Sequence, residues 1–170
     1  MELMNEATEL ASQIGAELIP RGWTVTTAES CTGGLAAGAL TAIAGSSAWF
    51  HGGLVTYANH VKTNLAGVPP DVLRKYGAVS RETVEAMARG AAVGLDADMA
   101  IAISGIAGPQ GGVPGKPVGT VWIAIAGPND AVESHVCHFD GDRQSVRMQA
   151  VVTALRATLM QLKHQSVTPP

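Results

Sequence analysis

The first half of the chain alternates between segments with helical spacing and short strand-like runs. Near the start, apolar residues recur every three or four positions: Met4, Ala7, Ala11, Ile14 and Leu18. This spacing predicts an amphipathic helix that ends before "PRGW" at 20–23. A short strand-like run, "TVTTA" (24–28), follows, and "GGLAAGALTAIAG" (33–45) then predicts a helix rich in small residues. The next strand is "GGLVTYA" (52–58).

Two polar residues mark the starts of further helices. Asn59 is expected to cap a short helix that contains Lys62, and Ser80 is expected to cap a longer one. The longer helix carries three apolar residues on one face: Val84, Met87 and Ala91. "MAIAIS" (99–104) then has the near-continuous apolar run of a strand that is covered on both faces.

The end of the chain has a different pattern. Two strand-like runs, "VGTVWIAIA" (118–126) and "AVESHVCHF" (131–139), are joined by "GPND", which favours an antiparallel hairpin. A long final helix is marked by apolar positions at Met148, Val152, Leu155, Leu159 and Leu162. The tail "VTPP" (167–170) is expected to fray. We therefore predict an α/β protein, a three-layer α/β/α sandwich with a mostly parallel sheet, in a single domain over 1–170.

Composition and charge narrow the function classes. The chain is 46% hydrophobic, its formal net charge is -3 and its pI is about 5.9, which opposes a nucleic-acid-binding face. The start, "MELMNEATEL", lacks the features of a signal peptide, and no stretch approaches the roughly 20 apolar residues of a membrane span, so a cytoplasmic location is predicted. Cys31 and Cys137 are expected to be free thiols. His135, Cys137 and His138 do not share one strand face, so no metal site is predicted.

Two loops follow strands that would be neighbours in a doubly wound sheet. "ESCTGG" (29–34) follows the first strand and "SGIAGPQGG" (104–112) follows the third. Ligands of such sheets bind beyond the carboxyl ends of the strands, where the strand order reverses. Each loop taken alone is equally well explained as a structural turn. Neither contains a dinucleotide-binding fingerprint or a P-loop.

Several long motifs occur in order between residues 25 and 147: "TAESCTGG", "AGSSAWFHGGLVTYANHVKTNLAGV", "GAVS", "ISGIAGPQGG", "KPVGTVW" and "FDGDR". In these motifs the chain resembles the CinA C-terminal domain family, whose stand-alone members are nicotinamide-nucleotide amidases. The resemblance implies the sheet order 2-1-3-4-5 with strand 4 antiparallel. It also implies hydrolysis of nicotinamide mononucleotide (NMN) to nicotinate mononucleotide and ammonia, without a cofactor. On matching positions, the serine nucleophile is Ser30, the lysine base is Lys62, and the accompanying tyrosine is Tyr57.

The chemistry of these residue types can be argued separately. A serine hydroxyl needs a base that takes its proton, and Lys62 can act as one only if burial or a nearby positive field lowers its pKa. A place in the first turn after Asn59, near the positive end of a helix dipole, favours Lys62 over three other lysines: Lys75, Lys116 and Lys163. Tyr57 is expected to bridge the hydroxyl and the amine. Cys31 is a rival nucleophile, and the geometry alone leaves the choice open, whereas the resemblance selects Ser30.

Further residues are candidates for holding the substrate. Gly33 and Gly34 open a helix and are expected to leave backbone N–H groups free for an oxyanion. Arg143 in "FDGDR" is the candidate for binding the phosphate, although it could equally be a surface residue paired with an aspartate. Four more candidates would supply hydroxyls and backbone donors, together with Gly45: Ser46, Ser47, Ser104 and Gly105.

Two other function classes stay open at this point. One is a catalytically silent nucleotide-binding sensor module with the same loops, against which the intact Ser30, Tyr57 and Lys62 argue. The other is a serine amidohydrolase that acts on a different small amide. The expected partner of the amidase is a small-molecule substrate, NMN. We also expect a homo-oligomer, although the sequence does not give the number of subunits.

Overall fold

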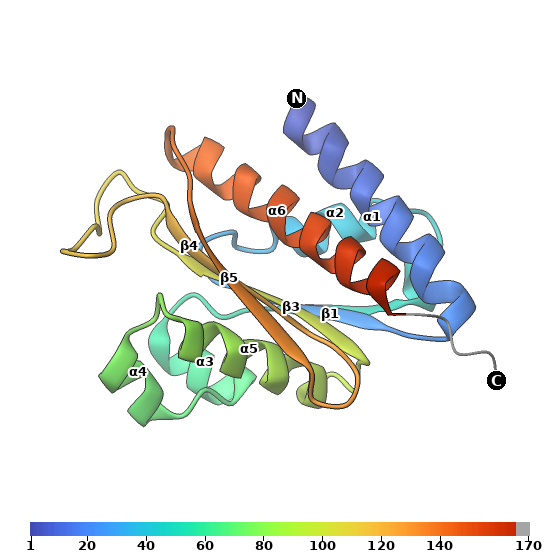
Figure 1. The fold of residues 1–170 in the computed structure, drawn as a ribbon, viewed down its shortest axis with the longest axis horizontal. Coiled ribbons are helices and arrows are strands. Elements are labelled where there is room, and N and C mark those ends of the chain that lie inside the picture. The colour runs from blue at the N-terminus through green and yellow to red at the C-terminus, as the bar shows by residue number, and fades with distance from the viewer. Residues whose placement is uncertain (166–170) are drawn as a thin grey trace.

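A central sheet lies between two layers of helices in the computed structural model, which describes residues 1–165 (Figure 1). The five strands are β1 (Val25–Glu29), β2 (Phe50–Val55), β3 (Met99–Gly105), β4 (Thr120–Ala126) and β5 (Val132–His138). Their order is β2-β1-β3-β4-β5. β1 pairs in parallel with both β2 and β3, whereas β4 is antiparallel to β3 and to β5. The predicted order and the antiparallel strand 4 are confirmed.

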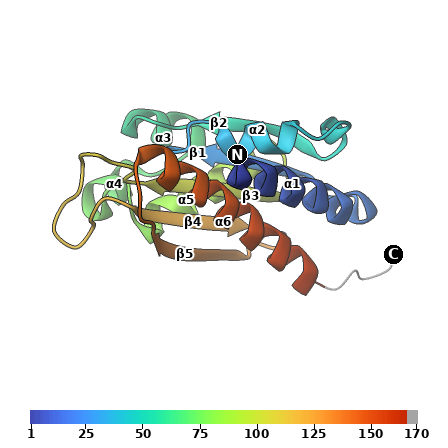
Figure 2. The same cartoon turned by 90° about the horizontal axis from the view of Figure 1, so that it is seen from above.

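The helices divide between the two faces of the sheet, as the two views show (Figures 1 and 2). One face carries α1 (Glu2–Arg21), α2 (Leu35–Thr41) and α6 (Arg143–His164). The other carries α3 (Asn59–Ala66), α4 (Pro70–Tyr76) and α5 (Arg81–Gly94). A short 3-10 turn, η1 (Ser46–Ala48), precedes β2. The predicted three-layer sandwich is therefore confirmed.

Two hydrophobic cores flank the sheet because its central strands are buried on both faces. On β3, Ile101 and Ile103 point toward the layer of α1, α2 and α6. Ala100 and Ala102 point the other way, toward α5. Successive side chains of a strand alternate between faces. The isoleucines of β3 therefore fill the core under α1, α2 and α6, whereas its alanines allow α5 to pack closely on the opposite face. No helix within residues 1–165 has the length and apolar character needed to cross a membrane.

Most of the predicted elements are present, with some differences in their bounds. The β4–β5 hairpin, the cap of α5 by Ser80 and the buried apolar face of α6 are confirmed. The first helix was expected to end before Pro20, but it continues to Arg21, since the last turn tolerates Pro20 and Gly22 closes the helix in the left-handed conformation, at φ 63. Met4 is 48% exposed rather than buried.

Three other boundaries differ from expectation, and two of them affect the site. Asn59 is not an N-cap: Ala58 takes that position in an extended conformation, and Asn59 is the first helical residue. β2 ends at Val55, so Tyr57 lies in the connection between β2 and α3. The second helix is shorter than 33–45, and α4 was not predicted, because none of its residues is buried and it shows no apolar face. The tail at 167–170 lies outside the described residues.

Candidate active site

Ser30 lies at the carboxyl edge of the sheet, directly after β1. Its backbone N–H donates to the carbonyl of Ile103 on β3, at 2.9 Å. Since Glu29 is in register with Ile103, Ser30 stands beside Ser104 on the neighbouring strand. The connection after β1 crosses one face of the sheet through α2, and the connection after β2 crosses the other through α3 to α5. Ser30 thus occupies the point where the strand order reverses, at which doubly wound sheets bind ligands.

Lys62 of α3 approaches this serine from the face of the sheet that α3, α4 and α5 cover. The lysine is only 1% exposed. Its Nζ lies 2.8 Å from the carbonyl oxygen of Thr56 and 2.9 Å from that of Tyr57. The same nitrogen lies 3.2 Å from Ser30 Oγ. A lysine and a serine that are 32 positions apart in the sequence are therefore within hydrogen-bonding distance.

Burial affects the pKa of this lysine. Removal from water disfavours the ammonium form and lowers the pKa of Lys62 below its ordinary value. Sequence reasoning attributed a lowered pKa to burial or to the helix dipole, and desolvation by burial is the leading cause here. A neutral amine has two N–H donors and one lone pair. In the structure Lys62 Nζ donates to both carbonyls and to Ser30 Oγ. In the neutral form the carbonyls of Thr56 and Tyr57 take the two donors, and the lone pair is left for the Ser30 hydroxyl.

Cys31 points to the opposite side of the sheet from Ser30. It belongs to the hydrophobic core under α1 and α6, where it is 5% exposed. Burial raises the pKa of the Cys31 thiol from 9.0 to about 11. A thiol must be deprotonated to be an effective nucleophile, so the chemistry of this position opposes the rival assignment.

The loop that carries Ser30 is fixed by the buried carboxylate of Glu29. This carboxylate accepts the backbone N–H groups of Gly34, Ala36 and Ala37, at 2.8 to 3.1 Å, and so caps the first turn of α2. The N–H of Gly33 donates to the carbonyl of Ser30, at 3.1 Å. The expectation that the N–H groups of Gly33 and Gly34 are free is therefore wrong, because the carbonyl of Ser30 accepts the first and the carboxylate of Glu29 accepts the second. The sequence shows Glu29 but not where its carboxylate points.

Arg147 of α6 is a residue that sequence reasoning missed. Its Nε donates to the carbonyl oxygen of Cys31 at 2.9 Å, and its Nη2 donates to that of Thr32 at 3.0 Å. These contacts join positions more than a hundred residues apart, so no local pattern could have found them. The only sequence signal is that Arg147 follows Arg143 by one helical turn, which places both on the same face of α6.

Tyr57 and Arg143 contact each other rather than the serine and lysine. Arg143 Nη2 donates to the Tyr57 hydroxyl at 3.1 Å, and Nη1 donates to the carbonyl of Gly108 at 2.9 Å. Within residues 1–165 no hydrogen bond joins the Tyr57 hydroxyl to Ser30 or Lys62, so the expected bridge is not formed. The Tyr57 backbone carbonyl holds Lys62 instead. Arg143 is exposed, and it forms no ion pair with an aspartate among the residues that the structure describes. Asp142 instead caps α6 by accepting the N–H of Ser145.

The other substrate-binding candidates fall into two groups. Ser104 and Gly105 end β3 next to Ser30, and the Ser104 hydroxyl donates to the carbonyl of Ala78 at 2.7 Å. Gly45, Ser46 and Ser47 lie before β2, at the level where β1 begins. The five residues of β1 separate the two ends by about 16 Å at a rise of about 3.3 Å per residue. Within one subunit these three residues are therefore not part of the site around Ser30.

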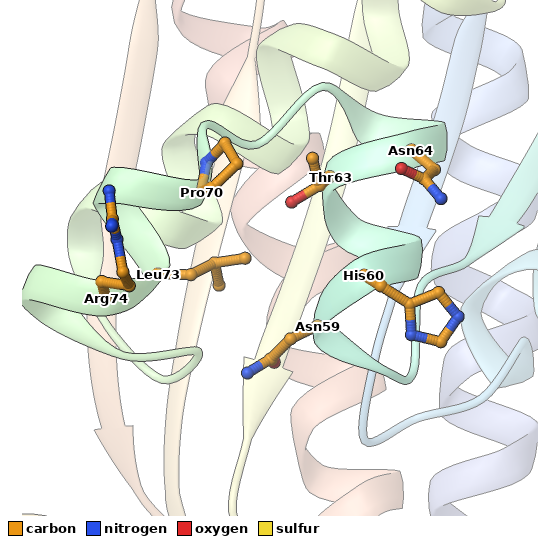
Figure 3. A pocket seen from close by; sticks show the side chains of 7 residues that line it. All are labelled: Asn59, His60, Thr63, Asn64, Pro70, Leu73 and Arg74. Atoms are coloured by element: carbon orange, nitrogen blue, oxygen red, sulfur yellow. The ribbon is translucent and has the colours of Figure 1, made fainter.

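A pocket of about 540 Å³ opens between α3 and α4, on the outer side of the helix that carries Lys62 (Figure 3). Its lining residues are Asn59, His60, Thr63, Asn64, Pro70, Leu73 and Arg74. None of them is a candidate catalytic residue. Within residues 1–165 no group of three His, Cys, Asp or Glu side chains is arranged to hold a metal ion.

Comparisons with known proteins agree on one family. The model of the CinA C-terminal domain matches residues 7–162. A protein of Enterobacter agglomerans named nicotinamide-nucleotide amidohydrolase PncC is 53% identical over 151 residues, which are 89% of this chain and 92% of that protein. The protein of the same name from Pseudomonas putida is 52% identical, over 92% of this chain and 97% of its own length.

Solved structures agree with the sequence relatives. A competence-damaged protein (CinA) superfamily protein from Klebsiella pneumoniae superposes with a TM-score of 0.89 at 42% identity, covering 94% of this chain and 99% of that one. The competence/damage inducible protein CihA from Agrobacterium tumefaciens gives 0.88 at 46% identity, with coverage of 93% and 96%. With the family model matching nearly the whole chain, this protein belongs to the CinA C-terminal domain family.

Proposed function

We propose that the protein is a nicotinamide-nucleotide amidase that hydrolyses NMN to nicotinate mononucleotide and ammonia, with Ser30 as nucleophile and Lys62 as base. The observation that carries the proposal is the 3.2 Å distance between Lys62 Nζ and Ser30 Oγ, made by a lysine that is 1% exposed. The name of the relatives from Enterobacter agglomerans and Pseudomonas putida supports the substrate class.

In the first half of the proposed reaction Ser30 becomes acylated. Ser30 Oγ attacks the carboxamide carbon while its proton passes to the neutral amine of Lys62. When the tetrahedral intermediate collapses, the C–N bond breaks and the ammonium group of Lys62 returns the proton to the leaving ammonia. A water molecule then attacks the ester in the same way: Lys62 takes its proton, the carboxylate is released, and the Ser30 hydroxyl is restored.

The oxyanion of the intermediate needs a donor close to Ser30. The backbone N–H of Thr32 donates to no acceptor within residues 1–165, although it lies two residues after the nucleophile. It replaces Gly33 and Gly34 as the proposed oxyanion donor, since their N–H groups already have partners. A preorganised backbone N–H at such a position stabilises the charge that develops in the transition state.

The remaining residues are assigned to binding and support. The Tyr57 carbonyl orients the amine of Lys62, and the Tyr57 hydroxyl positions Arg143. Arg143 is exposed at the same edge of the sheet and remains our candidate for the phosphate of NMN. Ser104, one strand from Ser30, is the candidate for contacting the carboxamide. The cytoplasmic location and the homo-oligomer stay predictions.

The test is to incubate the purified protein with NMN and to measure ammonia and nicotinate mononucleotide, with the Ser30→Ala protein as control. We expect the wild-type protein to release both products in equal amounts and Ser30→Ala to release neither. Binding of NMN without turnover by folded wild-type protein would favour the sensor module. Hydrolysis of other small amides but not of NMN would favour a different amidohydrolase.

A further inference from the structure

Within residues 1–165, Arg147 is the one cation that contacts the backbone of the loop after Ser30. Its two hydrogen bonds go to consecutive carbonyl oxygens, those of Cys31 and Thr32. No ion pair with a carboxylate occupies this guanidinium within residues 1–165. Its charge therefore acts on the two peptide groups that it contacts. Such a contact across adjacent carbonyls uses the planar fork of an arginine, which a lysine cannot reproduce.

The peptide group between Cys31 and Thr32 connects this arginine to the proposed oxyanion donor. In a planar trans peptide the C=O and the N–H point in opposite directions. With the Cys31 carbonyl held by Arg147 on the α6 side, the Thr32 N–H of the same peptide points away from α6. Ser30 Oγ also lies on the side away from α6, where it meets Lys62 of α3. A hydrogen bond to a carbonyl also polarises the N–H of that peptide and makes it a stronger donor.

The second contact fixes the next peptide in the loop. Arg147 holds the Thr32 carbonyl, and the N–H of this peptide, on Gly33, donates to the Ser30 carbonyl. On the far side of the loop, the Glu29 carboxylate holds the N–H of Gly34. Arg147 thus binds carbonyl groups of the loop and Glu29 binds one of its N–H groups. Within residues 1–165, the N–H groups of Cys31 and Thr32 have no backbone or carboxylate acceptor, and that of Thr32 belongs to the peptide group that Arg147 holds.

We infer that Arg147 is a positioning residue that orients and polarises the Thr32 N–H, so that this N–H stabilises the oxyanion formed when Ser30 attacks. The inference rests on the proposed serine mechanism but not on the identity of the amide. It assigns to Arg147 an effect on the chemical step and none on the binding of the ground-state substrate. Stabilisation that exists only in the transition state changes kcat and leaves KM nearly unchanged.

The test uses a reaction of Ser30 that does not need NMN. An alkyl fluorophosphonate is attacked by Ser30 Oγ: the O–P bond forms, the P–F bond breaks, fluoride leaves and the serine proton passes to Lys62. Intact-mass measurements give the rate constant of labelling, and Ser30→Ala checks the position. The variants are Arg147→Met, Arg147→Lys and a control on the same helix, Arg156→Met, whose arginine pairs with Glu6 far from the loop.

We expect Arg147→Met to slow labelling of Ser30 by about 10- to 100-fold, somewhat less than the loss of an oxyanion donor itself. The labelling rate of Arg147→Lys should lie between those of Arg147→Met and the wild-type protein. Arg156→Met should be labelled at the wild-type rate. In NMN hydrolysis, Arg147→Met should lower kcat by a similar factor, with KM changed less than about threefold and the acid limb of the pH profile unmoved.

Three results would overturn the inference: labelling of Arg147→Met at the wild-type rate, an equal loss in Arg156→Met, or no labelling of Ser30 in the wild-type protein. If Arg147→Met does not fold, a wild-type labelling rate in folded Arg147→Lys would overturn it as well. Labelling that behaves as expected together with no hydrolysis of NMN would refute the proposed substrate and leave the role of Arg147 supported.

Discussion

At the scale of single residues, burial shifts the pKa values of Lys62 and Cys31, near the end of β1, in opposite directions. Removing an ionisable group from water disfavours its charged form. For Lys62 this favours the neutral amine, which is the form that can take a proton from Ser30. For Cys31 it favours the neutral thiol, which is the unreactive form. One physical effect thus favours the proton-accepting form of the proposed base and the unreactive form of the rival nucleophile.

Replacement of the lysine by arginine tests whether Lys62 is a base. A guanidinium keeps the positive charge but does not lose its proton, so Lys62→Arg should lower kcat/KM about 10²- to 10⁴-fold, as loss of a general base does. In the wild-type protein kcat/KM should rise with pH through a pKa below the ordinary lysine value of 10.5, because burial lowers the pKa of Lys62. Lys163→Arg, at an exposed position of α6, is the control. Wild-type turnover by Lys62→Arg at neutral pH would exclude Lys62 as the base.

Substitution of Ser30 and of Cys31 distinguishes the two candidate nucleophiles. Ser30→Ala should abolish turnover of NMN, whereas Cys31→Ala should keep most of it, since the thiol faces the core under α6 and is protonated at neutral pH. Initial rates of ammonia release under saturating substrate give the comparison. If Cys31→Ala is inactive although folded, and Ser30→Ala retains activity, the serine mechanism is replaced by a thiol mechanism.

At the scale of elements, the approach of α3 to α5 determines where Lys62 lies. A Cβ atom added to Gly90 of α5 would stand 1.7 Å from the carbonyl oxygen of Ala66, the last residue of α3. Only a glycine allows this contact, because the neighbouring atom belongs to the backbone and cannot rotate away. The absence of a side chain at Gly90 of α5 therefore sets how closely α3, which carries the candidate base, can approach α5.

The helices and strands could be predicted from the sequence more fully than the contacts between them. Alternating apolar runs predicted the strands and most helices, because burial of one face imposes a period on the sequence. The sequence also placed Ser30 at the end of a central strand. It did not reveal the contacts of Glu29 or Arg147, since a hydrogen bond between a side chain and a loop produces no repeating pattern in the sequence. Gly45, Ser46 and Ser47 looked like site residues, but the path of α2 carries them to the other end of the sheet.

Substitution of Gly90 tests the helix contact. Gly90→Ala should lower the free energy of unfolding by about 1 to 3 kcal/mol, the usual cost of an overpacked contact, and should lower kcat because α3 must move with Lys62. Gly94→Ala is the matched control on α5: its nearest neighbour, the Leu65 carbonyl, would be 4.0 Å from the new Cβ, so stability should stay equal or rise slightly. Denaturant unfolding measures both. Equal stabilities of the two variants would contradict the close approach.

At the scale of the whole molecule, the buried ionisable groups make the stability depend on pH. For Lys62 the unfolded chain holds a proton that the native protein has lost, in the range between the lowered pKa and 10.5, so its contribution to stability rises with pH there. For Cys31 the sign is reversed. The native thiol stays protonated up to about pH 11, whereas the unfolded thiol ionises near 9.0, so the native state binds more protons in this range and loses stability as the pH rises.

The difference in stability between the wild-type protein and Cys31→Ala isolates the thiol. Its contribution should be complete below pH 9 and should fall by roughly 2 kcal/mol between pH 9 and 11, at about 1.36 kcal/mol per unit of pKa shift. Urea unfolding of both proteins in the presence of a reductant, at intervals from pH 8 to 11, measures this change, and the other ionisable groups largely cancel in the comparison. A difference that stays constant over this range would mean that the native thiol ionises near its ordinary pKa. In that case Cys31 would hold a reactive thiolate next to Ser30 at moderately alkaline pH, and the choice of nucleophile would rest on the substitutions alone.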